Sequence, residues 1–109
     1  MYKQGEIVIV KFPFTDGSEF KRRPALIVSN DLVNKTGDYL LVQITSKFSN
    51  DSLTMMINDS DCLKKLPLQS YIRTHKIFTL HNSLNISKLT SVNSKFRNKI
   101  VDKIIQLIK

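Results

Sequence analysis

Cysteine, glycine, proline and tryptophan are all scarce in this chain of 109 residues. It holds one cysteine (Cys62), three glycines, three prolines and no tryptophan. A single thiol cannot close a disulfide within the chain, so the fold needs no oxidising compartment. It also cannot supply the paired cysteines of a zinc site. The few glycines are scattered and form no glycine-rich phosphate-binding loop.

Long apolar runs are absent too. No stretch approaches the roughly 20 apolar residues of a membrane-spanning helix. The first residues, Met1–Gly5, lead directly into an Ile/Val-rich segment, without the charged and then apolar pattern of a secretion signal. Asp59 and Asp61 lie among turn-forming residues, which favours a role in a turn over metal binding. We therefore predict a cytoplasmic protein with no membrane partner, no metal site and no cofactor.

Acidic residues are outnumbered by basic ones. Seventeen Lys and Arg residues against nine Asp and Glu give a net charge of +8, with a pI near 9.8. A surplus of this size favours a polyanionic partner such as nucleic acid; the alternative is a surface charge that serves only solubility. The length suits one domain spanning residues 1–109, and a hydrophobic content of 41% argues against disorder.

Segments rich in Ile and Val predict a series of short β-strands. Alternation over Asp38–Thr45 places Leu40, Val42 and Ile44 on one face of its strand, while a break in the alternation between Ile72 and Ile77 predicts a bulge. The expected strands are Glu6–Phe12, Pro24–Ser29, Asp38–Thr45, Leu53–Ile57, Ser70–Leu80 and Asn85–Leu89.

The C-terminal segment has a different period. Its apolar residues recur at helical spacing: Val92, Phe96, Ile100, Ile104 and Leu107/Ile108. Thr90 or Ser91 is the predicted N-cap. Strands followed by one amphipathic helix predict a mainly β fold, a small, strongly curved sheet or barrel plugged or flanked by that helix.

Three groups of polar residues are placed where they could bind phosphate. Arg22 and Arg23 come where a polar loop meets a strand, and a guanidinium donates in a fork that matches two phosphate oxygens. Thr45 ends a strand and is followed by Ser46 and Lys47. The third group is Arg73, Thr74 and His75. Each residue alone would be an ordinary surface cation or strand-end hydrogen bonder.

RNA offers a simple chemistry to such residues, because its 2′-hydroxyl is an internal nucleophile beside each phosphodiester. Attack on the adjacent phosphorus needs alignment, charge neutralisation and proton transfer. Arg23 and Thr45 could supply the first two. Arg23 is a poor general base because a guanidinium is very hard to deprotonate, and His75 is a candidate base only if it reaches the site.

Several motifs resemble those of one family. They are Gly5-Glu6-Ile7-Val8, Phe12-Pro13-Phe14, Gly17-Ser18-Glu19, Arg23-Pro24-Ala25-Leu26-Ile27-Val28, Asn30-Asp31, Ile44-Thr45 and Ile72-Arg73-Thr74. With these motifs in this order, the chain resembles the MazF/PemK ribonuclease toxins of type II toxin–antitoxin systems.

The resemblance implies an SH3-like barrel of five to six strands that forms a homodimer. It implies metal-independent, sequence-selective cleavage of single-stranded RNA, leaving 2′,3′-cyclic phosphate and 5′-hydroxyl ends, and inhibition by an acidic antitoxin. By position, Arg23 and Thr45 become the catalytic pair. The RNA-binding residues implied in the same way are Phe14, Gly17, Ser18, Arg22, Ser46, Lys47, Arg73 and His75.

Two other functions fit parts of the pattern. Gyrase poisons built on a similar barrel act by docking a C-terminal helical segment, but the helix here ends at Ile108-Lys109 with no aromatic anchor. A plain nucleic-acid-binding module would use the same basic surface without cutting. The segment from Glu19 to Arg22 is bulkier and more basic than the loop common in the family, which bears on the cleavage sequence.

Overall fold

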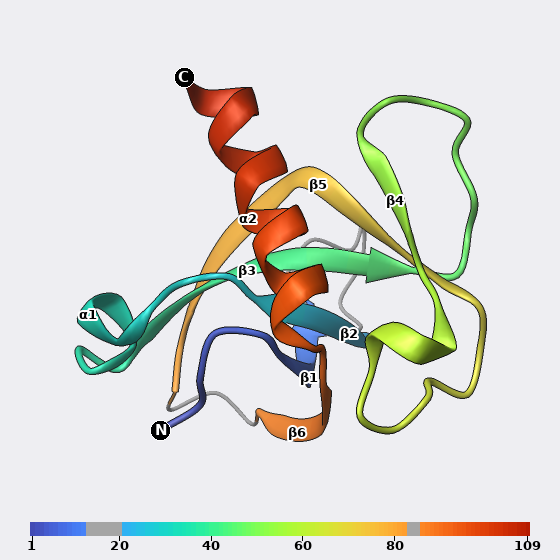
Figure 1. The fold of residues 1–109 in the computed structure, drawn as a ribbon. Helices are drawn as coiled ribbons and strands as arrows, with labels where there is room; N and C mark the ends of the chain where they lie inside the picture. The colour runs from blue at the N-terminus through green and yellow to red at the C-terminus, as the bar shows by residue number, and fades with distance from the viewer. Residues whose placement is uncertain (13–20, 83–85) are drawn as a thin grey trace.

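One curled sheet of six strands, crossed by a C-terminal helix, forms the computed structural model of the protein (Figure 1). The structure describes residues 1–12, 21–82 and 86–109. The strands are β1 (Glu6–Phe12), β2 (Lys21–Ile27), β3 (Asp38–Thr45), β4 (Thr54–Ile57), β5 (Ser70–His81) and β6 (Ser87–Ser91). The helices are α1 (Asp31–Asn34), the 3-10 turn η1 (Asp59–Asp61) and α2 (Ser94–Ile108).

The strands follow the order β4-β5-β3-β2-β1-β6, and every neighbouring pair is antiparallel. The segment that follows η1 then contacts β6, the edge strand at the opposite end of the sheet from β4. Cys62 forms a β-bridge with Val92, and the Leu63 amide donates to the Ser91 carbonyl at 2.9 Å. These contacts curl the sheet into a half-barrel. The predicted mainly β barrel with a C-terminal helix is confirmed.

Two apolar clusters lie on opposite faces of the sheet. The first packs under α2 and includes Val42, Ile44 and Ile100, while the second includes Tyr39 and Leu41. Neighbouring residues of β3 therefore enter different clusters, as the alternation predicted. Burial on both faces also explains why the sequence of β1 is an almost continuous apolar run.

A bulge interrupts β5 where the sequence predicted one. Val42 of β3 pairs with Ile77, but the next residue, Gln43, pairs with Arg73. Residues 74–76 are therefore left without a partner on β3. Because three residues are an odd number, the bulge exchanges the faces of β5. Ile72 consequently packs in the cluster under α2, whereas Phe78 packs in the other.

The start of β2 differs from the prediction. The strand begins at Lys21, so Pro24 lies inside it and not at its entrance. Pro24 pairs with Ile9 of β1, whereas the part of β2 that pairs with β3 is limited to Ala25, Leu26 and Ile27. At Pro24 the strand has one partner and behaves as an edge, where a missing N–H is tolerated.

The N-cap of α2 also differs from the prediction. Asn93 caps the helix, and its side-chain oxygen accepts from the Phe96 amide at 2.8 Å. Thr90 and Ser91 cannot serve, because both belong to β6 and pair with β1. No helix in the described part of the chain combines the length and apolar character that crossing a bilayer requires.

Candidate nucleic-acid interface

A gap between β2 and β3 positions the two residues predicted to be catalytic. The two strands pair from Ile27 to Ala25 and no further. Each then continues along its other neighbour: Arg23 pairs with Val10 of β1, and Thr45 pairs with Tyr71 of β5. The strand ends therefore part, and Arg23 and Thr45 lie on either side of the opening.

A pocket of about 350 Å³ fills this opening. Its basic side chains are Lys21, Arg22, Arg23 and Lys47; its hydroxyl groups belong to Thr45, Ser46 and Ser70; and its apolar lining is Ile9, Pro24, Ile44, Leu66, Pro67, Leu68 and Leu89. No acidic side chain is among the described residues that line it. The pocket thus joins a cationic side to an apolar side, which suits a ligand with both a phosphate and a base.

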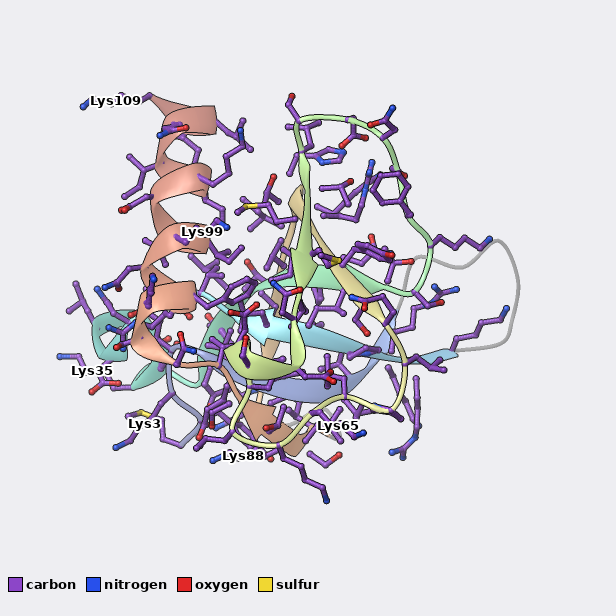
Figure 2. The ribbon with its side chains drawn as sticks, turned by 45° about the vertical axis from the view of Figure 1, so that its right-hand side comes forward. Lys3, Lys35, Lys65, Lys88, Lys99 and Lys109 are labelled. Carbon is purple, nitrogen blue, oxygen red and sulfur yellow. The ribbon has the colours of Figure 1, made fainter. Side chains whose placement is uncertain are left out.

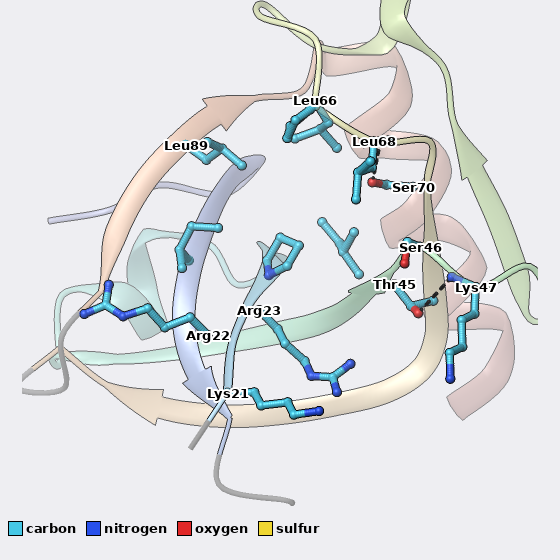
Figure 3. Close-up of a pocket in the computed structure, with 14 residues that line it drawn as sticks. Lys21, Arg22, Arg23, Thr45, Ser46, Lys47, Leu66, Leu68, Ser70 and Leu89 are labelled. Carbon is cyan, nitrogen blue, oxygen red and sulfur yellow. Dashed lines mark hydrogen bonds between the residues drawn. The ribbon is translucent and has the colours of Figure 1, made fainter. Parts of the chain in front are cut away.

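The cations do not all point the same way. Arg23 and Lys21 extend towards the side of the pocket that holds Thr45 and Lys47, whereas Arg22 extends in the opposite direction (Figure 3). The Thr45 hydroxyl oxygen accepts from the Lys47 amide at 3.1 Å. That bond uses one acceptor site and leaves the hydroxyl hydrogen available to donate to a ligand.

The pocket cations have no acidic neighbours to neutralise them in the part of the chain that the structure describes. The ion pairs found there are Arg73 with Asp51 and Lys88 with Glu6, and neither involves a residue of the pocket. Guanidinium and ammonium groups beside a hydroxyl, with no described carboxylate paired to them, are suited to binding an anion.

The other predicted RNA-binding residues do not all gather here. Arg22, Ser46 and Lys47 line the pocket, but Arg73 and His75 do not. Arg73 is bound to Asp51, and His75 is exposed on the β5 bulge. The remaining three, Phe14, Gly17 and Ser18, lie outside the described residues.

Asp51 retains its negative charge at neutral pH. A hydrogen bond from the Thr54 hydroxyl, followed in importance by one from Arg73, holds the pKa of the Asp51 carboxyl below its ordinary value. The charge of Arg73 is therefore matched by a carboxylate, whereas no ion pair involving Arg23 is found among the described residues.

The apolar wall of the pocket was not predicted from the sequence. Leu66, Pro67 and Leu68 lie in the connection between η1 and β5, and Leu89 lies on β6. The same four residues line an adjoining hollow of about 730 Å³ that also includes Lys64 and Lys65. The available signal was three consecutive apolar or proline residues in a connection with neither strand nor helix periodicity.

Positive charge also extends beyond the pocket. Lys3, Lys35, Lys65, Lys88, Lys99 and Lys109 project from several sides of the molecule (Figure 2).

Among residues 1–12, 21–82 and 86–109, no three His, Cys, Asp or Glu side chains gather closely enough to hold a metal ion.

The fold and the pocket together define a small basic half-barrel with a cation-lined pocket where two strands of its sheet part. The family model of PemK-like, MazF-like toxins of type II toxin–antitoxin systems matches residues 3–108, and the chain belongs to this family.

Solved structures share the whole fold. A MazE–MazF complex from Deinococcus radiodurans is 18% identical, with a TM-score of 0.80 over 98% of this chain and 95% of the other. An endoribonuclease in complex with its cognate antitoxin, from a mycobacterial species, is 24% identical, with a TM-score of 0.76 over 98% and 97%. The Mycobacterium tuberculosis toxin MazF-mt6 is 14% identical, with a TM-score of 0.71 over 94% and 93%. No curated protein matches the sequence significantly.

Proposed function

We propose that this toxin is a metal-independent, sequence-selective endoribonuclease that cleaves single-stranded RNA, including mRNA. The observation that carries the proposal is the placement of Arg23 and Thr45 on two sides of one pocket that no described acidic residue lines. Family membership and the similarity to structures named as endoribonucleases support it.

Cleavage uses the 2′-hydroxyl of the RNA as the nucleophile. Its oxygen loses its proton and bonds to the adjacent phosphorus while the bond from phosphorus to the 5′-oxygen breaks. The 5′-oxygen takes up a proton as it leaves, so the products are a 2′,3′-cyclic phosphate and a 5′-hydroxyl, with no net gain or loss of protons. The Arg23 fork binds the non-bridging oxygens as their charge grows, and the Thr45 hydroxyl donates to one of them. Lys21 and Lys47 add positive charge at the same side of the pocket.

The partners follow from the same proposal. Antitoxins are named in the complexes of similar fold, and an acidic antitoxin would be attracted to the basic surface of this chain. We propose that the toxin acts in the cytoplasm as a homodimer and that its antitoxin covers the pocket.

Purified protein incubated with a long single-stranded RNA in EDTA tests the activity. We expect fragments with cyclic-phosphate and 5′-hydroxyl ends. Arg23→Ala should abolish them while the circular dichroism spectrum stays native. Lys35→Ala removes one exposed positive charge beside α1 and serves as the matched control. Intact RNA, or cleavage only with added metal, would refute the proposal; binding without cleavage would identify a nucleic-acid-binding module instead.

A further inference from the structure

The connection between β3 and β4, residues 46–53, carries part of the pocket and is attached to β5 at three points. The Phe48 ring packs edge-on against Tyr71, with centroids 5.5 Å apart. Asp51 is paired with Arg73 at 2.9 Å. The Leu53 carbonyl accepts from the amide and the hydroxyl of Thr74, at 2.9 and 2.6 Å.

Arg73 is the centre of a closed hydrogen-bond network. Its Nη1 donates to Asp51 Oδ2 at 2.9 Å and to Thr54 Oγ1 at 2.6 Å. Thr54 Oγ1 in turn donates to Asp51 Oδ1 at 2.9 Å, and that oxygen also accepts from the Leu53 amide at 3.0 Å. The network thus joins β4, β5 and the end of the connection.

Arg73 lies close to the pocket without lining it. Across the sheet it pairs with Gln43, and Tyr71, two residues earlier on β5, pairs with Thr45. Its side chain is 18% exposed, and a carboxylate already occupies its guanidinium. A phosphate that bound Arg73 would have to compete with Asp51, whereas Arg23 has no such competitor among the described residues.

We propose that Arg73 is a positioning residue: through Asp51 and Thr54 it fixes residues 46–53 so that Lys47 and the Thr45 hydroxyl stay at the pocket. Residues 46–53 are linked to Thr45 by the hydrogen bond that the Lys47 amide donates to the Thr45 hydroxyl oxygen. This differs from the RNA-binding role that the sequence predicted for Arg73. The expected change in RNA cleavage rests on the proposed function. The expected loosening of residues 46–53 does not.

Asp51→Asn distinguishes the two roles because one predicts tighter RNA binding and the other predicts slower cleavage with binding little changed. If Arg73 bound RNA, removing its competitor would tighten RNA binding and steepen its salt dependence by about 0.7 in the logarithmic slope. If Arg73 positions the connection, the same substitution loosens it. Cleavage should then slow about tenfold or more at saturating RNA, with KM little changed. Asp102→Asn, on an exposed position of α2, makes the same change in net charge and is the control.

Binding is measured with a non-cleavable RNA that carries 2′-deoxy sugars, over a range of salt concentrations. Arg73→Gln should resemble Asp51→Asn in rate, and the double variant should be no slower than either single one, because both break the same network. Rates are compared at a temperature where circular dichroism shows every variant folded.

A second measurement needs no RNA. Trypsin cuts after lysine, so the rate of cutting at Lys47 reports how firmly the connection is held. We expect Asp51→Asn and Arg73→Gln to be cut there several-fold faster than the wild type and Asp102→Asn. Unchanged cutting, or tighter and more salt-dependent RNA binding in Asp51→Asn than in Asp102→Asn, would overturn the proposal. Faster cutting in a protein that never cleaves RNA would refute the proposed function alone.

Discussion

Arg23 and Thr45 are the residues that would face each other if the ladder between β2 and β3 continued two positions beyond its last pair, Ala25 with Gln43. The ladder stops, and β1 and β5 hold the separated ends instead. The backbone of each residue is thus held by a different antiparallel partner, with a pocket in place of the missing pairs. Such an arrangement holds two groups at a set separation without their touching, as cleavage at a phosphodiester requires.

The geometry of the fork, more than its charge, should determine the rate. Arg23→Lys keeps the charge but replaces two parallel donors by a single ammonium. We expect cleavage to fall about 100-fold, the usual cost of one donor to a developing oxyanion, with little change in the salt dependence of binding. Single-turnover rates measure this. An Arg23→Lys variant as fast as the wild type would reduce Arg23 to a source of charge.

Thr45 allows a comparison of two close substitutions. Thr45→Ser keeps the hydroxyl, whereas Thr45→Val keeps the shape and removes it. The proposed role requires Ser to retain most of the activity and Val to lose about 100-fold. Equal losses in both variants would indicate that the methyl group matters more than the oxygen.

Gly37 should be hard to replace because of its backbone conformation. Its φ of +92° is a conformation that side-chain-bearing residues rarely adopt. A Cβ added there would also lie 2.8 Å from Nε2 of His81, so the exposed imidazole would have to shift, which adds little to the cost. We expect Gly37→Ala to lower the free energy of unfolding by about 1–3 kcal/mol. Urea unfolding should show a lower midpoint with an unchanged slope, and Lys35→Ala in the preceding turn is the control. A midpoint equal to that of the wild type would contradict the argument from the backbone conformation.

Local patterns predicted most of the fold. Alternation on β3 identified which residues share a face, and its failure between Ile72 and Ile77 identified the bulge. Both depend only on the period of a strand, which the sequence contains. The boundaries were less accurate, because they depend on pairing. β2 extends back to Lys21 owing to β1, and β6 continues through Ser91, which moves the helix cap to Asn93.

The site was predicted only in part. Arg23 and Thr45 could be identified from a familiar order of motifs, but their shared pocket depends on where one ladder ends, and no local pattern contains that. The partner of Arg73 was missed for the same reason: Asp51 lies 22 residues away in sequence and meets it only through the pairing of β4 with β5. Leu66 and Leu68 have no periodicity that would have marked them as a wall.

Cys62 should react slowly with thiol reagents. Burial raises the pKa of the thiol above its ordinary value of 9.0, and the charges of Asp61 and Asp59 raise it further. Because only the thiolate is nucleophilic, alkylation by iodoacetamide at pH 8 should be slower in the native protein than in urea. Asp59→Asn, which removes one of the two charges, should speed native labelling modestly.

The same shift gives a dependence of stability on pH. A group whose pKa is higher in the folded state favours folding while it is protonated, so its contribution is present below about pH 9 and is lost as the pH rises through the folded value. Wild type should therefore lose stability above pH 9 more steeply than Cys62→Ala, as urea titrations at several pH values would show. Equal slopes would mean that the thiol titrates as it does in the unfolded chain. Cys62 forms the β-bridge to Val92 that joins the segment after η1 to the far edge of the sheet. If iodoacetamide labels Cys62 faster than its thiolate fraction in the folded state allows, the labelling rate would instead measure how often this bridge opens.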